Sequence, residues 1–266
     1  MKPYSIFFLS LIFLFSTACE EVIELDLEST DSQLVIEGQI TDQSLPATVS
    51  LSRSNGFYDT GDYQRVENAS VNITDGKGNV FPLTEVAAGQ YQSTDIQGEV
   101  GENYQLQVEV AGEIVTGNSQ LLPSVQLETV SFDDRPGPAG GGDALIPVAH
   151  FQDPPGDTYI RFILVRNDTL QNDILLYDDN FTDGQAVEFP IFNAEVYPGD
   201  KVQLTTLVID KGVFDYFNTL ANITGQGTGP GGGNSTAPAN PETNLEGNAL
   251  GYFEAASATQ IEVVVP

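Results

Sequence analysis

Hydrophobic and polar residues alternate over most of the chain, and a period of two is typical of half-buried antiparallel strands. The clearest such segment is Tyr-Gln-Leu-Gln-Val-Glu-Val at 104–110. Asp-Gly-Lys-Gly-Asn at 75–79 follows another alternating segment and is a strong hairpin signal. Turn signals recur about every 8–12 residues, which predicts a β-sandwich of the immunoglobulin or prealbumin type. The chain has no tryptophan and a single cysteine, so it lacks the marks of a true immunoglobulin domain.

A second set of strands is predicted beyond Leu-Leu-Pro at 121–123, which resembles a domain junction. Further strands are predicted at 125–132, 144–151, 159–166, 173–177, 186–192, 201–209, 250–255 and 261–265. Apolar residues at spacings of three and four predict one short helix at 212–223. Residues 225–240 are rich in Gly, Pro, Ser, Thr and Asn and predict a mobile loop.

These patterns predict an all-β protein of two sandwich domains with one short helix. The predicted organisation is a signal peptide at 1–18, an acidic tether with a first strand at 19–32, an N-terminal β-sandwich at 33–122 and a β-rich domain at 123–266. The length after residue 18 suits two domains of about 100–130 residues each.

The N-terminus has the order of a secretory signal peptide. Lys2 supplies a positive charge, residues 5–15 are almost entirely apolar, and small residues follow at 16–18. An apolar helix of about 11 residues would span about 17 Å, which is too short for a hydrocarbon core of about 30 Å. The sequence therefore predicts cleavage rather than a retained transmembrane helix.

Cys19 stands directly after these small residues and is the only cysteine of the chain. Ala18-Cys19 resembles a bacterial lipobox, although Ser16 replaces the usual leucine three residues before the cysteine. Lipidation of Cys19 would anchor the protein permanently to a membrane. The alternative is an unmodified cysteine within an ordinary signal peptide.

Glu20 and Glu21 follow the predicted lipidation site. Acidic residues in this place resemble the signal that sends Bacteroidota lipoproteins to the outer face of the outer membrane. The prediction is therefore a lipid-anchored outer-membrane protein that faces the cell surface. The alternative is that these residues form only an acidic tether before the first strand.

The charge balance excludes two classes of partner. The chain carries 9 Lys and Arg against 38 Asp and Glu, a formal net charge of −29. A nucleic-acid surface needs clustered basic residues, so nucleic acid is not an expected partner. Attraction to anionic lipid head groups is excluded for the same reason, so the lipid itself must provide the anchor.

No catalytic site and no bound cofactor are predicted. His150 is the only histidine and lies in an apolar segment, where a hydrogen-bonded structural role is expected. A zinc site would need more His or Cys ligands. Carboxylates are abundant and leave glycosidase chemistry open, but most acidic residues of such a chain are solvated surface groups.

Calcium is the ion that suits the composition best, because it takes oxygen ligands from loops. Residues 178–184 begin like a calcium loop, but Phe181 stands where an oxygen ligand belongs. The pairs Asp59 with Asp62 and Asp153 with Asp157 are looser alternatives. The sequence therefore assigns no metal site and leaves calcium as an open alternative.

Phe57, Tyr58 and Tyr63 lie in one loop and form the predicted binding patch. Exposed aromatic rings can stack on sugars or anchor a protein interface. The alternative is that these rings cap the end of the sandwich core. Asp168-Thr169-Leu170 resembles the Bacteroidota O-glycosylation pattern, which marks Thr169 as a glycosylation candidate.

Several short phrases, in this order, resemble Bacteroidota outer-membrane lipoproteins of domain-of-unknown-function family 4249. They are CEEVIEL at 19–25, VIEGQITD at 35–42, ASVNITD at 69–75, GQY at 89–91, FQDP at 151–154, YPGD at 197–200 and NALGYF at 248–253. The family is typically encoded beside a TonB-dependent receptor. The resemblance therefore implies a non-enzymatic surface lipoprotein that is an accessory of such a β-barrel transporter. The alternatives are a surface adhesin or glycan-binding lipoprotein and, third, a secreted hydrolase.

Overall fold

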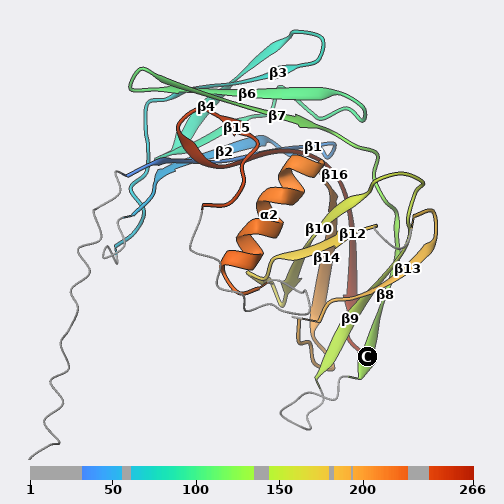
Figure 1. The fold of residues 1–266 in the computed structure, drawn as a ribbon. Coiled ribbons are helices and arrows are strands. Elements are labelled where there is room, and N and C mark those ends of the chain that lie inside the picture. The colour runs from blue at the N-terminus through green and yellow to red at the C-terminus, as the bar shows by residue number, and fades with distance from the viewer. Residues whose placement is uncertain (1–31, 56–60, 135–143, 180–182, 193, 227–239) are drawn as a thin grey trace, which may run out of the picture. The chain divides into compact units, whose positions relative to one another are not determined.

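Strands make up most of the chain that the computed structural model describes, which is residues 32–55, 61–134, 144–179, 183–192, 194–226 and 240–266 (Figure 1). Within these ranges there is one helix, so the predicted all-β class with a single short helix is confirmed. The predicted signal peptide, Cys19, Glu20 and Glu21 lie outside the described residues, as does most of the predicted loop at 225–240.

Thirteen strands form one long, curled sheet. They are β1 (Leu34–Thr41), β2 (Ala47–Arg53), β3 (Ser70–Asp75), β4 (Val80–Ala87), β5 (Gln90–Ser93), β6 (Asn103–Val110), β7 (Glu113–Gln120), β10 (Tyr159–Arg166), β11 (Thr169–Leu170), β12 (Leu175–Asp178), β14 (Lys201–Val208), β15 (Leu245–Glu246) and β16 (Ala249–Val264). The order is β11-β10-β14-β16-β1-β2-β5-β4-β3-β6-β7-β15, and β12 pairs with β10 beside this path. A second sheet has the order β13-β9-β8, from β8 (Leu127–Asp134), β9 (Leu145–Gln152) and β13 (Ala186–Pro190).

The first core lies between two parts of the curled sheet. One side carries Ile36 and Leu51 on β1 and β2, and the other carries Leu106 and Val108 on β6, all of them buried. Each strand buries every second residue, as the period of two predicts. The same alternation turns Glu37 to the opposite face of β1.

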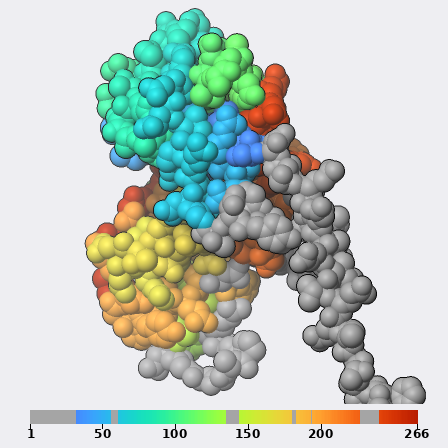
Figure 2. Space-filling view, turned by 90° about the vertical axis from the view of Figure 1, so that its left-hand side faces the viewer, coloured from blue at the N-terminus to red at the C-terminus, as the bar shows by residue number. Residues whose placement is uncertain are grey.

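A second core lies between the three-stranded sheet and the part of the main sheet formed by β10, β12 and β14. Phe162 is central to it, with ring centroids 6.2 Å from Phe151 and 5.2 Å from Phe189. Residue 122, the predicted domain boundary, follows β1 to β7, but the first core also contains Leu245, Ala249, Phe253 and Ala255 from the C-terminal part of the chain. On the face of the molecule in Figure 2, the residues coloured blue to green and those coloured yellow to orange form separate groups.

Strand β16 takes part in both cores. Its first half pairs in parallel with β1, and its second half pairs antiparallel with β14 (Figure 1). The prediction of two strands at 250–255 and 261–265 was therefore wrong, because the small and polar residues between them stay hydrogen-bonded to β14. Gly251 has a φ of +103°, and a side chain there would collide with the carbonyl oxygen of Ile36, so the close pairing of β16 with β1 needs a glycine.

The helix α2 (Lys211–Ile223) lies where the spacing of apolar residues predicts it. Asp210 caps its start by accepting a hydrogen bond from the Val213 amide at 3.1 Å. The buried face of α2 packs against a third apolar cluster that includes Leu207 and Tyr252 of the main sheet. Within the described ranges, no helix has the length and apolar character needed to cross a membrane.

Candidate functional site

The face of β1, β2 and β5 that points away from the first core is polar. This face is a consequence of strand alternation, because every second residue of a half-buried strand is free to be polar. Its side chains are Glu37 and Gln39 of β1, Thr48 and Ser50 of β2, and Gln90 of β5. Ser50 Oγ accepts hydrogen bonds from Gln90 Nε2 at 3.0 Å and from Arg65 Nη1 at 3.2 Å.

Glu37 lines three neighbouring hollows, which we together call the Glu37 groove. The largest has a volume of about 850 Å³ and is also lined by Asp62, Tyr63 and Arg65. The other two have volumes of about 360 and 300 Å³, and Arg161 lines both of them. These volumes are in the range of small-ligand sites, which are concave and carry a few polar groups that fix orientation.

A buried ion pair forms the floor of the Glu37 groove. Arg161 Nη2 of β10 donates to Glu254 Oε1 of β16 at 2.6 Å, and Gln39 Nε2 donates to the same oxygen. The Arg161 guanidinium also lies 4.4 Å from the ring centroid of Phe217, a cation–π distance. Arg161 Nε and Glu254 Oε2 are buried without a hydrogen-bond partner, so the pair keeps one donor and one acceptor unused.

The pairing with Glu254 keeps the buried Arg161 guanidinium charged. Burial opposes the charge of Arg161, but the Glu254 carboxylate outweighs it and holds the pKa of the guanidinium above its usual range. Burial raises the pKa of Tyr216 to about 12 and also raises that of Tyr252. Both phenols therefore stay neutral at physiological pH and keep their hydrogen as a donor.

Tyr63 is the part of the predicted binding patch that the structure describes. It is 64% exposed and lines the largest hollow of the Glu37 groove. The alternative that this ring caps the sandwich core therefore does not hold for Tyr63. Phe57 and Tyr58 lie outside the described residues, and ligand binding by the patch stays a prediction.

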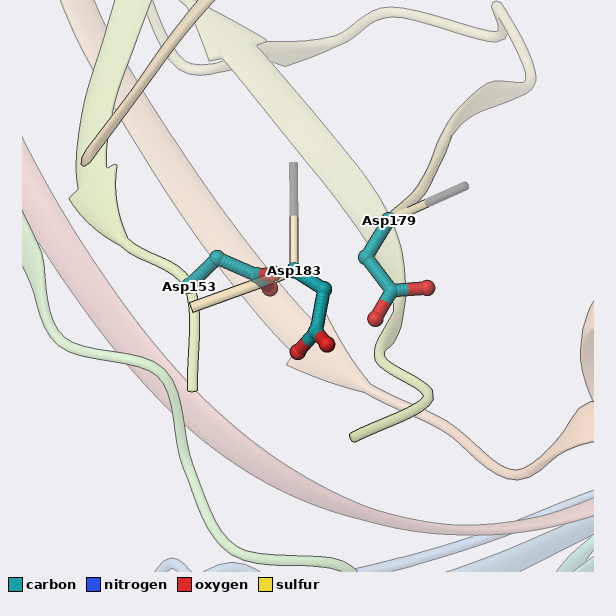
Figure 3. Close-up of side chains that lie close together, drawn as sticks. All are labelled: Asp153, Asp179 and Asp183. Carbon is teal, nitrogen blue, oxygen red and sulfur yellow. The ribbon is translucent and has the colours of Figure 1, made fainter. Parts of the chain in front are cut away.

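Three aspartates next to strands that contribute to the second core lie close together (Figure 3). Asp153 follows β9, Asp179 follows β12, and Asp183 precedes β13; one carboxylate oxygen from each lies within 4.8 Å of the others. Asp153 is completely buried, and neither of its carboxylate oxygens has a hydrogen-bond partner. Burial raises the pKa of the Asp153 carboxyl, and the Asp179 carboxylate raises it further, whereas the nearby Thr158 hydroxyl and Gly184 amide act in the opposite direction without reversing the rise.

Hydrogen bonds hold the two segments of this aspartate cluster together. Asp183 Oδ1 accepts from the Gly156 amide at 2.8 Å, the Asp153 amide donates to the Gln185 carbonyl at 2.9 Å, and Gln152 Nε2 donates to the Gly184 carbonyl at 3.1 Å. Each segment is a crossover between the two sheets, β9 to β10 and β12 to β13. The cluster therefore joins both crossovers.

Both parts of this cluster are candidates in the sequence, but as separate ones. The sequence pairs Asp153 with Asp157, which is exposed and lies outside the cluster. Residues 178–184 fail as a self-contained calcium loop at Phe181, a residue that lies outside the described part of the chain. The signal that was missed is that both segments connect the same two sheets, which places their ends side by side.

His150 is hydrogen-bonded, as the sequence predicts. Its Nε2 lies 2.7 Å from Ser131 Oγ on β8, and its Nδ1 lies 3.8 Å from Glu188 Oε1 on β13. The order of hydroxyl, imidazole and carboxylate is that of a hydrolytic triad. However, the Glu188 side chain is 79% exposed and too distant to orient the ring, and none of the three residues lines the Glu37 groove.

Thr169, the glycosylation candidate, lies at an exposed hairpin between β10 and β11. Asn167 and Asp168 both have positive φ values there, as two-residue hairpin turns require. The hydroxyl-bearing residue is thus sterically accessible, and its modification stays a prediction.

Comparison with known proteins identifies a family and a likeness among solved structures. The family described as "Domain of unknown function (DUF4249)" matches residues 20–262. Among solved structures, the selenomethionine-substituted chicken interferon gamma receptor alpha chain is similar at 7% identity and a TM-score of 0.20, over 66% of this chain and 88% of that one. No curated protein matches the sequence.

Proposed function

The chain belongs to the DUF4249 family, and we propose that it is a non-enzymatic, lipid-anchored binding protein of the outer membrane that works with a TonB-dependent transporter. The observation that carries this proposal is the Glu37 groove. Its hollows are large enough for a small ligand or for a loop of a partner, and they combine an exposed aromatic ring with charged groups of both signs.

The chemistry of the Glu37 groove favours binding. Tyr63 offers a flat apolar face, Arg65 offers hydrogen-bond donors, and Glu37 and Asp62 offer acceptors. Among the described residues that line the groove there is no histidine or cysteine that could form a base–nucleophile pair. Such a surface can hold a polar solute without transforming it.

The anchor is proposed from the sequence. Lipidation of Cys19 would hold the protein at the membrane, and Glu20 and Glu21 would direct it to the outer face. A net charge of −29 keeps the protein away from anionic surfaces, so its place must depend on the lipid and on protein contacts. A TonB-dependent β-barrel at the same surface is the proposed partner.

Gentle detergent extraction of the tagged full chain tests the proposal. The β-barrel transporter is expected to co-purify with the wild type, and Tyr63→Ala or Glu37→Gln is expected to reduce its recovery. Cys19→Ala is expected to release the protein from membranes. If the wild type purifies without a transporter and Cys19→Ala still sediments with membranes, the proposal is wrong.

A glycan-binding role without a transporter is the second candidate, and the exposed Tyr63 ring favours it. Binding of the isolated full chain to a glycan array, lost on Tyr63→Ala, would support this role over transport. The hydrolase alternative rests on Ser131 and His150. It predicts hydrolysis of activated esters that disappears with Ser131→Ala, whereas the binding proposal predicts no Ser131-dependent hydrolysis.

A further inference from the structure

We propose that Asp153, Asp179 and Asp183 form a calcium site that joins the two crossovers of the second core. The first reason is geometric. One oxygen from each residue lies within 4.8 Å of the other two. Even at this full spacing the three oxygens lie about 2.8 Å from their common centre, so shifts of a few tenths of an ångström bring them to the Ca–O distance of about 2.3–2.6 Å found in proteins.

The second reason is the state of Asp153, which is independent of the spacing. Its side chain is completely buried, faces the other two carboxylates, and has no hydrogen bond to either oxygen (Figure 3). A buried carboxylate is normally paired or coordinates a metal, because an isolated buried charge is very unfavourable. No ion pair in the described residues includes any of the three aspartates, so a bound cation is the compensation that fits.

The third reason is that the cluster is held in place before any ion binds. The Gly156 amide donates to Asp183 Oδ1, and two further hydrogen bonds join residues 152–153 to 184–185. Asp183 keeps its second oxygen for an ion, and Asp179 is only partly buried, so the site is open on one side to ions and water. Preorganisation of this kind lowers the entropic cost of binding.

Calcium suits these donors better than other common ions. All three ligands are carboxylates, which favour calcium, magnesium or manganese over zinc or copper. The ligands come from two irregular segments and leave the remaining coordination positions to carbonyls and water. Calcium accepts six to eight oxygens in irregular geometry, whereas magnesium demands a near-octahedral site.

Calorimetric titration of the chelator-treated full chain with calcium chloride tests the site. One calcium per chain is expected, with a Kd at or below about 1 mM, the range of extracellular calcium modules. At a calcium concentration 100 times the Kd, the Tm is expected to rise by about 5–10 °C. Magnesium chloride at the same concentration is expected to give a smaller shift, and an equal or larger one would overturn the assignment to calcium.

The decisive comparison uses Asp153→Asn, which keeps the size of the side chain and removes its charge. In calcium the variant is expected to lose the Tm increase, and in chelator it is expected to melt at or above the wild-type Tm, because a buried charge has been removed. Asp157→Asn, which changes an exposed neighbour outside the cluster, is the matched control and is expected to respond to calcium like the wild type.

Asp179→Asn provides an independent variant at a less buried position, should Asp153→Asn fold poorly. It is expected to weaken calcium binding by tenfold or more. The proposal is overturned if the wild type shows neither binding heat nor a calcium-dependent Tm shift, or if Asp153→Asn and Asp179→Asn respond to calcium as the wild type does.

Discussion

Among the described residues two carboxylates are completely buried, and their surroundings are opposite in character. Glu254 of β16 lies 2.6 Å from the guanidinium of Arg161 and also accepts a hydrogen bond from Gln39. Asp153, after β9, has no hydrogen bond to either oxygen of its carboxylate and faces two further carboxylates. Both residues carry the same type of charge at the same degree of burial, so their different surroundings indicate different means of compensation.

The chain thus provides a counter-charge for Glu254 but none for Asp153. Arg161 and Glu254 come from neighbouring parts of one sheet and satisfy each other beneath the Glu37 groove, which leaves the groove free for a ligand. The aspartate cluster combines three acidic groups without a basic one. The Arg161–Glu254 pair therefore needs no external ion, whereas the aspartate cluster needs a cation from solution to balance its negative charge.

Removal of the internal counter-charge should have the largest effect. Arg161→Met leaves Glu254 buried without its partner, and breaking a buried pair in this way costs about 3–5 kcal/mol. Urea unfolding of the full chain measures this cost. The double variant Arg161→Met with Glu254→Gln is expected to recover at least half of it. A single-variant cost below about 1 kcal/mol would mean that Glu254 is compensated by other groups.

Removal of the Asp153 charge should change the free energy of unfolding by an amount that depends on calcium. Asp153→Asn in calcium at 100 times the wild-type Kd is expected to be less stable than wild type by about 2.7 kcal/mol, and this difference should vanish or reverse in chelator. Urea unfolding in both buffers checks it. Glu254→Gln is the contrasting variant, because its cost should be the same with and without calcium. Equal costs of Asp153→Asn in both buffers would remove the distinction between the two regions.

Loss of the hydrogen bond between Ser131 and His150 should destabilise the protein less than loss of either buried charge. Ser131→Ala removes the 2.7 Å contact with His150 and is expected to cost about 0.5–1.5 kcal/mol, the usual contribution of a neutral hydrogen bond. Thermal unfolding measures it. A cost above about 3 kcal/mol would show that this pair has the weight of a charged contact.

Substitution of the exposed Tyr63 in the Glu37 groove should have the smallest effect on stability and the largest effect on binding. Tyr63→Ala is expected to change the free energy of unfolding by no more than about 0.5 kcal/mol, because the ring is largely exposed. The same variant is expected to lose most of the transporter recovery in the extraction experiment. A destabilisation above about 2 kcal/mol would instead place the ring in the core.

The local elements could be predicted from the sequence because their signals are local. The alternating segment at 104–110 corresponds to β6, and the apolar spacing at 212–223 corresponds to α2. The continuity of β16 could not be predicted, because the residues at 256–260 resemble a break and only their pairing with β14 makes them a strand.

Neither buried carboxylate could be assigned from the sequence. Arg161 and Glu254 are 93 residues apart and meet because β14 pairs with both β10 and β16 and so brings these two strands close together in the sheet. Asp153 meets Asp179 and Asp183 because two crossovers begin and end at the same edge. Sequence spacing measures distance along the chain, whereas both contacts depend on the order of strands in the sheets.

The metal content of the full chain tests this contrast most directly, when it is measured by elemental mass spectrometry after equilibration with calcium at 10 times the calorimetric Kd and corrected for the calcium of the buffer. Wild type and Glu254→Gln should each carry one calcium per chain, and Asp153→Asn should carry none. Calcium retained by Asp153→Asn at the wild-type stoichiometry would contradict the conclusion that the buried Asp153 carboxylate is compensated by an ion. So would a wild-type protein that remains free of calcium after equilibration with 10 times the calorimetric Kd.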